Sequence, residues 1–368
     1  MCMGCAPQID VASADAFAER MIGMLNSAGL ALMTSIGHRT GLFDVMSELP
    51  PATSAGIAEA AGLNERYVRE WLGAMVTGGI VGYDPASRHF HLPAEHASAL
   101  TRAASPNNCA AFMQWIAVLG GVEDKIVECF RHGGGVPYEA YPRFHEVMAE
   151  ESGQTVLPAL LEHILPLVPG LTQRLAAGID VLDLGCGAGR ALMVMAEAFP
   201  NSRFTGHDLS EGAIDAGRKA ASERGLANLR FAAQDATTMG ESEVYDLITT
   251  FDAVHDQAWP DKVLAAIRRA LRTDGIYLMQ DIAGSSEVHK NMDHPMGPFI
   301  YTISCMSCMT VSLARGGMGL GAMWGEEKAT EMLAEAGFTE VEVKRLPHDF
   351  QNNYYVMRKS PATVRQAA

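Results

Sequence analysis

Apolar residues near the N-terminus recur at the spacing of one helix face. The face consists of Phe17, Met21, Met24, Leu25, Ala28, Leu32 and Ile36, with few polar residues between them. This period predicts a helical stretch from Ala12 to about Met46. A helix with such a face needs a surface to pack against.

Residues 53–92 predict two short helices followed by a hairpin. Thr53 or Ser54 can cap the first helix, Gly62 marks the turn, and the second helix is expected from about Asn64 to Thr77. The arms of the hairpin are expected at residues 80–83 and 89–92. This order of elements resembles a winged helix, which raises the hypothesis of DNA binding.

The charges of the second helix argue against DNA binding. Arg66 and Arg69 are offset by Glu65 and Glu70, whereas helices that read a DNA groove carry a net basic face. We expect instead that this module packs against the N-terminal helices and forms the interface of a homodimer.

The middle of the chain, residues 105–178, is expected to be mostly helical. Its helices are interrupted by Gly133-Gly134-Gly135 and by prolines. A flexible run followed by aromatic side chains is typical of a cap over a ligand. The alternative is an ordinary helix start that packs its aromatic residues inward. The candidate ligand contacts in this cap are Tyr138, Tyr141 and His145.

From Gly178 onward the pattern changes to short apolar runs separated by helical stretches. The runs are IDVLDL, SRFTGHD, LRFAAQD, YDLITTF and GIYLMQDI. This alternation predicts βαβ units in an α/β fold, with a doubly wound parallel sheet covered by helices on both faces. We expect three parts: residues 1–104, residues 105–178, and a catalytic domain over residues 179–368.

The composition of the 368-residue chain limits the classes of partner that it is expected to bind. Its 28 Lys and Arg against 43 Asp and Glu give a formal net charge of −15, which disfavours nucleic acid and anionic membranes. The N-terminus lacks the pattern of a secretory signal, and the most apolar stretch, Pro298 to Trp324, is interrupted by polar residues. We therefore expect a cytoplasmic location, no membrane partner, and reduced thiols at the seven cysteines.

The stretch VLDLGCGAGR places three glycines directly after an apolar run. Gly185, Gly187 and Gly189 follow Asp183, as in the first turn of a doubly wound sheet, where glycines let a ligand approach backbone N–H groups. A carboxylate before the loop would repel a pyrophosphate and attract an ammonium group. The expected ligand is therefore a nucleoside joined to a zwitterionic tail.

Two further acids end the next two predicted strands. Asp208 is placed to accept hydrogen bonds from both hydroxyls of a ribose. Asp235 can accept from the amino group of adenine, while the backbone N–H of Ala236 is offered to the ring. Any one of these acids alone would more often be a turn residue.

At these residues the sequence resembles the class I S-adenosylmethionine (SAM)-dependent methyltransferases. The resemblance covers Ile179 to about Lys359 and implies a Rossmann-like seven-stranded sheet that binds SAM and releases S-adenosylhomocysteine (SAH). It implies that the glycine loop holds the methionine part, Asp208 the ribose and Asp235 the adenine. The full set of cofactor residues expected from it is Asp183, Gly185, Gly187, Gly189, Asp208, Leu209, Asp235, Ala236 and Phe251.

A candidate general base follows the fourth strand. His255 and Asp256 lie at its carboxyl end, where small-molecule O-methyltransferases with an N-terminal winged-helix dimerisation domain carry His-Asp-Trp. The resemblance implies that His255 is the base and that Asp281, after the next strand, orients it. The tryptophan is displaced here, in HDQAWP, so a helix-capping or backbone-bonded role for His255 is the alternative. Asp256 is a candidate acceptor contact.

An insertion of residues 284–325 lies between the fifth strand and the next helix. Cys305 and Cys308 form C-x-x-C, as do Cys2 and Cys5. Four thiolates can bind zinc, but neither pair has the flanking turn residues of such sites, and we expect no metal. A soft apolar wall of the acceptor pocket or of the dimer core fits the many nearby methionines better. The expected acceptor contacts of the insertion are Tyr301 and Trp324.

These features together predict an enzyme that methylates a hydroxyl, or a thiol, of a small and partly apolar molecule. A SAM-binding winged-helix regulator without catalysis is the alternative from another class. A methyltransferase for RNA or protein would need a broad basic or open surface, which the net charge disfavours.

Overall fold

The computed structural model describes residues 9–106, 108–154 and 156–359, and the chain divides into two compact units between Ala117 and Val118. Each unit is described here by itself. Cys2 and Cys5, one of the two C-x-x-C pairs, lie outside the described residues.

The first unit contains a helical bundle and a small hairpin. Asn64 caps the second helix of the predicted winged helix, and the hairpin pairs Tyr83 with Phe90. The core of the unit includes Phe43, Trp71 and Leu72, all buried. The elements are α1 (Val11–Thr40), α2 (Leu42–Glu48), α3 (Ser54–Ala61), α4 (Glu65–Thr77), β1 (Gly82–Asp84), β2 (His89–His91), α5 (Ala94–Leu100), the 3-10 turn η1 (Arg102–Ala104) and α6 (Cys109–Phe112).

The predicted helical stretch to Met46 is two helices. Gly41 ends α1 in the left-handed conformation, with φ of 73°, and its N–H caps carbonyls of the last turn. Glycine adopts this conformation without a side-chain penalty, which makes it the common residue after a helix. The predicted stretch is therefore broken into two helices at Gly41, and the spacing of the apolar residues did not reveal this break.

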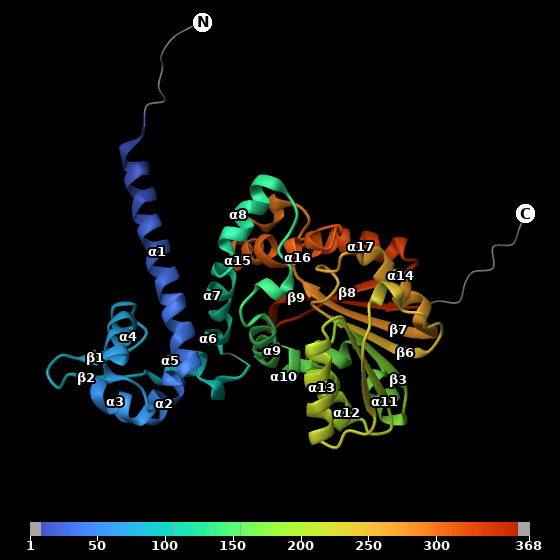
Figure 1. The fold of residues 1–368 in the computed structure, drawn as a ribbon, viewed down its shortest axis with the longest axis horizontal. Helices are drawn as coiled ribbons and strands as arrows, with labels where there is room; N and C mark the ends of the chain where they lie inside the picture. Colours follow the sequence, from blue (N-terminus) through green and yellow to red (C-terminus); the bar gives the residue numbers. More distant parts are fainter. Residues whose placement is uncertain (1–8, 107, 155, 360–368) are drawn as a thin grey trace, which may run out of the picture. The chain divides into compact units, whose positions relative to one another are not determined.

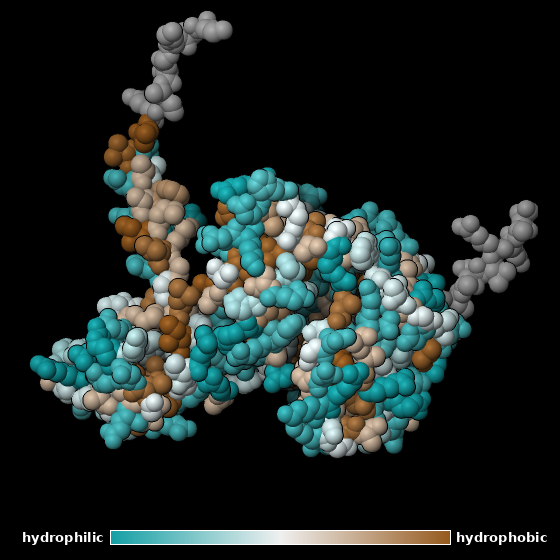
Figure 2. Space-filling view, viewed as in Figure 1, coloured by the Kyte–Doolittle hydropathy of each residue, from teal (hydrophilic) through white to brown (hydrophobic). Residues whose placement is uncertain are grey.

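The apolar face of α1 lies in solvent in the single chain. Phe17 is 60% exposed and Leu25 is 73% exposed. Figure 2 shows hydrophobic surface along much of this helix. A long exposed apolar face on one helix is typical of an interface with a partner.

The second unit is built on a seven-stranded sheet in the order β5-β4-β3-β6-β7-β9-β8. Strands β3 to β7 run parallel to one another, and β9 is antiparallel to both β7 and β8. This order confirms the predicted Rossmann-like sheet. The strands are β3 (Asp180–Leu184), β4 (Arg203–Asp208), β5 (Leu229–Ala233), β6 (Tyr245–Phe251), β7 (Leu271–Ile282), β8 (Val341–Leu346) and β9 (Asp349–Arg358).

Helices cover both faces of the sheet, as Figure 1 shows. On one face Leu192 and Ile214 pack over Val181, and on the other Leu264 and Leu333 pack against the opposite side of the strands. The alternation of side chains along each strand therefore separates two apolar cores. The helices are α11 (Leu171–Ala177), α12 (Arg190–Ala198) and α13 (Glu211–Glu223) on the first face, and α14 (Pro260–Ala270) and α17 (Gly325–Glu335) on the second.

The cap segment precedes the sheet in the chain, and its glycine run follows the end of α8, as predicted. The helix α7 (Gln114–Gly120) spans the boundary between the units. It is followed by α8 (Glu123–His132), the 3-10 turn η2 (Tyr138–Ala140), α9 (Phe144–Gln154), α10 (Val156–Ala159), the π-helical turn η3 (Leu160–Ile164) and the 3-10 turn η4 (Leu165–Leu167).

The predicted insertion forms a run of helical turns that begins after β7. The π-helical turn η7 (Ser304–Cys308) joins α15 (Gly297–Ile303) to α16 (Met309–Ala314), after the 3-10 turn η6 (Val288–Asn291). By length and composition alone, residues 297–314 could cross a membrane, with a mean hydropathy of 1.3. Within the second unit, however, Thr310 accepts from the N–H of Val136 and the carbonyl of Met306 accepts from Tyr141. The run therefore packs against the cap.

Candidate active site

The glycine loop follows β3 and has the tight geometry that its sequence predicts. Gly185, Gly187 and Gly189 all have positive φ, at 71°, 55° and 69°. A Cβ on Gly185 would lie 2.5 Å from the Cβ of Ala253, and one on Gly189 would lie 2.2 Å from the ring of Phe231. A Cβ on Gly187 would meet nothing within 4 Å. Gly187 therefore faces open space beside the loop, where a ligand can approach the backbone.

Two of the three predicted cofactor acids lie at neighbouring strand ends. The carboxylate of Asp208, at the end of β4, accepts from the N–H of Gly187 at 2.8 Å and from the N–H of Ser210 at 2.8 Å. Asp235 follows β5 and accepts from the N–H and hydroxyl of Thr237. Each carboxylate oxygen has more than one acceptor position, so both acids can still bind hydroxyl or amino donors of a ligand.

The third acid, Asp183, is buried at the end of β3. It is 2% exposed, and the hydroxyl of Thr249 donates to its Oδ1 at 2.7 Å. Burial raises the pKa of Asp183 to about 7, although the bond from Thr249 lowers it. No cation among the described residues contributes to the pKa of Asp183, and a ligand ammonium group could supply the counter-charge.

The remaining predicted cofactor residues lie beside these acids. Leu209 is 43% exposed, Ala236 is buried, and Phe251 ends β6 next to the core. The donor and acceptor types of the whole set fit an adenosyl amino acid: acids for the ammonium, ribose and adenine groups, and backbone N–H groups in the glycine loop.

His255 and Asp281 form a buried pair at the ends of β6 and β7. Nδ1 of His255 lies 2.8 Å from Oδ1 of Asp281, and both side chains are buried. An ionised carboxylate can only accept, so the imidazole donates from Nδ1 and Nε2 is left for another group. Burial opposes the charged imidazole, but the charge and hydrogen bond of Asp281, with help from Cys308, raise the pKa of His255 well above its ordinary value.

Trp324 binds the same carboxylate. Its indole N–H donates to Oδ1 of Asp281 at 2.9 Å, and the backbone N–H of Ile282 donates to that oxygen as well. Trp324 was predicted as an acceptor contact, and the structure places its indole N–H on the carboxylate that His255 also contacts.

The residues predicted to form the cap contact the loop that carries His255. The hydroxyl of Tyr138 donates to Asp256, and Tyr141 is buried with its hydroxyl 2.5 Å from the carbonyl of Met306. His145 is exposed, beside the ring of Tyr138. Tyr301 accepts from the side chain of Asn291 at 3.0 Å. The structure therefore brings Tyr138 and Asp256 together, and it places His145 at the surface.

Two groups beside His255 were not predicted as site residues. Burial raises the pKa of the Cys308 thiol, and the imidazole of His255 lowers it in part. Asp252 has φ of 49°, accepts from Gln280, and lies with His255 and Asp281 so that one ligand atom of each falls within 4.8 Å of the others. Nδ1 of His255 is already engaged by Asp281, so we derive no metal site from this group.

The insertion also reaches the predicted adenine end. Arg315, just after α16, lies 3.6 Å from Oδ2 of Asp235. Arg315 is conspicuous in the sequence because it is a single cation in a long apolar stretch, but nothing in the sequence pattern indicated that Asp235 is its partner.

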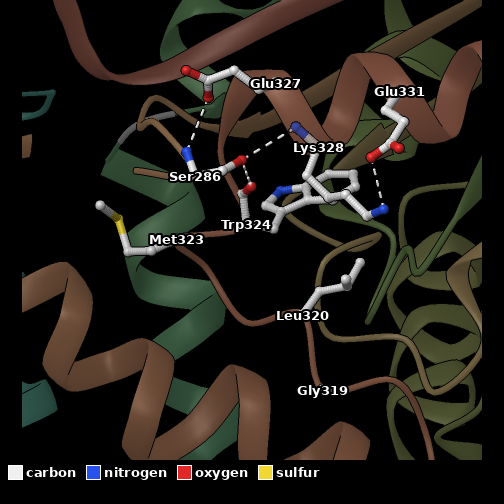
Figure 3. A pocket seen from close by; sticks show the side chains of 8 residues that line it. All are labelled: Ser286, Gly319, Leu320, Met323, Trp324, Glu327, Lys328 and Glu331. Carbon is white, nitrogen blue, oxygen red and sulfur yellow. Dashed lines mark hydrogen bonds and ion pairs between the residues drawn. The ribbon is translucent and has the colours of Figure 1, made fainter. Parts of the chain in front are cut away.

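A pocket of about 610 Å³ opens on the other side of Trp324. Figure 3 shows that Glu327 binds the backbone of Ser286 and that Lys328 pairs with Glu331. The polar side chains that line the pocket thus largely form hydrogen bonds and ion pairs with one another. The lining includes Trp324, which contacts Asp281, but neither His255 nor Asp281.

Comparisons with known proteins agree with this architecture. Residues 28–102 match the Rv2258c-like winged HTH domain, and residues 175–337 match a methyltransferase domain family. A methyltransferase of Aspergillus campestris, ungE', is 34% identical over 132 residues, which are 32% of this chain and 38% of that protein. The chain thus spans well under two thirds of that relative.

Solved structures resemble nearly the whole chain. Human N-acetylserotonin methyltransferase in complex with SAM has a TM-score of 0.68 at 16% identity, over 97% of this chain and 100% of that one. The mitomycin 7-O-methyltransferase MmcR has a TM-score of 0.67 at 18% identity, over 95% and 99%. At these identities the likeness concerns the fold. The two family matches show that the chain joins an N-terminal winged helix-turn-helix domain to a SAM-dependent methyltransferase domain.

Proposed function

We propose that this protein transfers the methyl group of SAM to a hydroxyl, or a thiol, of a small molecule. The observation that carries the proposal is the buried pair of His255 and Asp281 at the edge of the sheet that also carries the glycine loop. The structures of similar fold include methyltransferases named for the small molecules N-acetylserotonin and mitomycin.

The proposed reaction requires few chemical groups. SAM, when bound, supplies a methyl group on a positively charged sulfur. His255 would take the proton of the acceptor through Nε2, while Asp281 holds the ring and stabilises the imidazolium that forms. Trp324 and the backbone of Ile282 fix the carboxylate that does this. The cap over residues 138–141 would exclude water from the reacting groups.

The acceptor we infer is small, partly apolar and not strongly acidic. The titratable neighbours that act on His255 and Asp256 are chiefly acids, including Asp281 and Asp208. An anionic acceptor would be repelled by these groups, whereas a neutral phenol or thiol would not.

Two further features support a small molecule over a nucleic acid. On α4, Arg66 pairs with Glu70 and Arg69 with Glu65, so the basic side chains of this helix are matched on the helix itself. The net charge of −15 points in the same direction. We infer a cytoplasmic enzyme rather than a DNA-binding sensor.

We also infer that the protein is a homodimer through its first unit. The exposed residues of α1 repeat at steps of three and four, so they form one stripe along the helix. A second copy would bury this stripe against its own equivalent, as symmetric dimers do.

The direct test combines binding with turnover. Titration of SAH into the full chain, followed by calorimetry, should show saturable binding to the wild type and to His255→Gln. Methyl transfer from labelled SAM to a panel of phenols, thiols and matched carboxylates should then fall about 100- to 10,000-fold in His255→Gln. Turnover that stays near wild type would remove the base assignment, and absence of SAH binding would remove the proposed function.

A further inference from the structure

Three buried oxygen atoms near the proposed base accept no hydrogen bond from the residues that the structure describes. They are Oδ1 of Asp252, Oε1 of Gln280 and Oδ2 of Asp281. Gln280 and Asp281 are both 0% exposed. A buried acceptor without a donor costs stability, so each such atom in a folded protein requires an explanation.

The side chains of Asp252, Gln280 and Asp281, here called the oxygen cluster, form one group with His255. Nε2 of Gln280 donates to Oδ2 of Asp252 at 2.9 Å, and Oδ1 of Asp281 accepts from Nδ1 of His255 at 2.8 Å. One ligand atom each of Asp252, His255 and Asp281 lies within 4.8 Å of the others. The oxygen cluster therefore lies next to the imidazole that is proposed to take the proton of the methyl acceptor.

The sheet fixes the position of Asp252. Its N–H donates to the carbonyl of Gln280 at 3.1 Å, which continues the pairing of Phe251 with Gln280 between β6 and β7. Asp252 has φ of 49°, a left-handed conformation that asparagine and aspartate adopt more readily than other residues with a side chain. Such conformations are concentrated at ligand sites. Asparagine is therefore the substitution that removes the charge of residue 252 and suits its backbone.

The carboxylates around His255 have no basic side chain as a partner. Within the described ranges of the chain, no lysine or arginine forms an ion pair with Asp252, Asp256 or Asp281, and Asp281 pairs with His255. Burial raises the pKa of Asp252 well above its ordinary value, Asp281 raises it further, and the charge of His255 opposes both effects. Buried carboxylates are normally paired with a positive charge, so a cationic group of a ligand would complement this site.

A primary ammonium group matches the oxygen cluster in both charge and hydrogen bonding. It carries three N–H donors, no acceptor and one positive charge, whereas a hydroxyl brings a single donor. The sulfonium of SAM has the charge but no N–H, so it cannot donate to these oxygens. The ammonium group of the cofactor is expected at Asp183, after a different strand.

We propose that the oxygen cluster binds an ammonium group of the methyl acceptor, which makes the substrate class phenols or thiols that carry a primary amine. The inference rests on the proposed function, because it takes the position of the acceptor from the role of His255. Asp252 then determines specificity: it binds a part of the acceptor that does not react. Since the oxygen cluster adjoins the imidazole, a short linker between the amine and the methylated group suits the site.

The test uses phenols with a primary amine on alkyl chains of increasing length. Each is matched by a neutral phenol that has a methyl group in place of the amine. Calorimetry on the SAH-loaded full chain measures binding, and labelled SAM measures kcat/KM, with EDTA present in both assays. Wild type should prefer at least one amine over its neutral partner by about tenfold or more, because a hydrogen bond between charged groups is worth at least that much. Asp252→Asn should lose this preference.

A matched control removes the same charge elsewhere. Asp274 also has a left-handed backbone, with φ of 62°, and it is exposed near the other end of β7. Asp274→Asn should keep the wild-type preference for the amine. SAH binding reports that each variant is folded, and Gln280→Met replaces Asp252→Asn if that variant does not bind SAH.

Four results would overturn the inference. They are a wild type without preference for any amine, a preference that survives in Asp252→Asn, a loss of affinity in Asp252→Asn for SAM but not for SAH, and binding of Mg²⁺ alone that depends on Asp252. The third would assign the carboxylate to the sulfonium, and the fourth to a metal ion.

Failure of this inference is distinguishable from failure of the proposed function. If SAH binds and neutral phenols are methylated as well as their amine partners, the ammonium site is wrong and the proposed methyl transfer stands. If SAH does not bind to the wild type, the proposed methyl transfer is wrong, and the ammonium site falls with it.

Discussion

The buried carboxylate of Asp183 should make cofactor binding depend on pH. Burial raises its pKa to about 7, so in the free protein the group is half protonated near neutrality and mostly neutral at pH 5. An ammonium group of the ligand pairs with the ionised form only. Binding at low pH must therefore first remove a proton from Asp183, which weakens the apparent affinity.

The size of the pH effect on SAH affinity follows from the linkage between proton binding and SAH binding. With a pKa of about 7 in the free protein and an ionised carboxylate in the complex, the dissociation constant of SAH should be about 50-fold weaker at pH 5 than at pH 7. Above pH 7 the affinity should level off. The sign is that of any acid whose ionised form binds a cation, and the raised pKa of Asp183 moves the loss of affinity up to near neutral pH.

Calorimetry at a series of pH values, in buffers of different ionisation heat, measures both the affinity and the protons released. Asp183→Asn should bind SAH weakly at all pH values and show no step near pH 7. Thr249→Val removes the hydroxyl that stabilises the ionised form, and it should move the step to higher pH. A wild-type affinity that is flat between pH 5 and pH 7, or a step that survives in Asp183→Asn, would refute the reasoning.

Three further outcomes are expected. Gly189→Ala should lower the melting temperature of the protein, because an alanine there adopts a left-handed backbone, at a cost of about 1–2 kcal/mol, and is overpacked, at a cost of about 1–3 kcal/mol. Gly187→Ala has open space around it and should lose only the backbone contribution to stability. Equal melting temperatures of the two variants would contradict this. Asp281→Asn removes the charge that raises the pKa of the base, so the acid limb of the turnover profile should shift to lower pH as the maximum rate falls; an unmoved limb would assign it to another group. Leu25→Glu should shift the mass measured by light scattering from dimer to monomer while Ser27→Glu does not, and a wild-type monomer would exclude the interface.

The local sequence pattern was sufficient to predict the sheet and the acids at the sheet edge where the cofactor is expected. Period, turn glycines and the acids after each strand act over a few residues, so Asp183, Asp208 and Asp235 could be placed at strand ends before any contact was known. The same holds for the helix cap at Thr53, one of the two residues expected there, and for the helix start near Asn64. These features depend on backbone geometry, which neighbouring residues determine.

Contacts across long sequence separations could not be predicted in the same way. Trp324 was predicted only as an acceptor contact, and its hydrogen bond to Asp281, 43 residues earlier, was not foreseen. Arg315 was not assigned to Asp235, and Cys308 was described only as part of a soft wall. Each pairing depends on how the insertion folds back onto β6 and β7, and apolar periodicity carries no information on that path.

In the proposed enzyme, the two chemical tasks fall to different neighbouring strands. Asp183 and Asp208 lie at the ends of β3 and β4 and Asp235 follows β5, whereas His255 follows β6 and Asp281 lies at the end of β7. Much of what would recognise the acceptor therefore lies in one contiguous stretch, from His255 to Trp324, and the rest lies in residues 138–145. A chimaera that imports both segments from a relative, with Arg315 kept for its ion pair with Asp235, should acquire a new substrate while its requirement for the methyl donor stays the same.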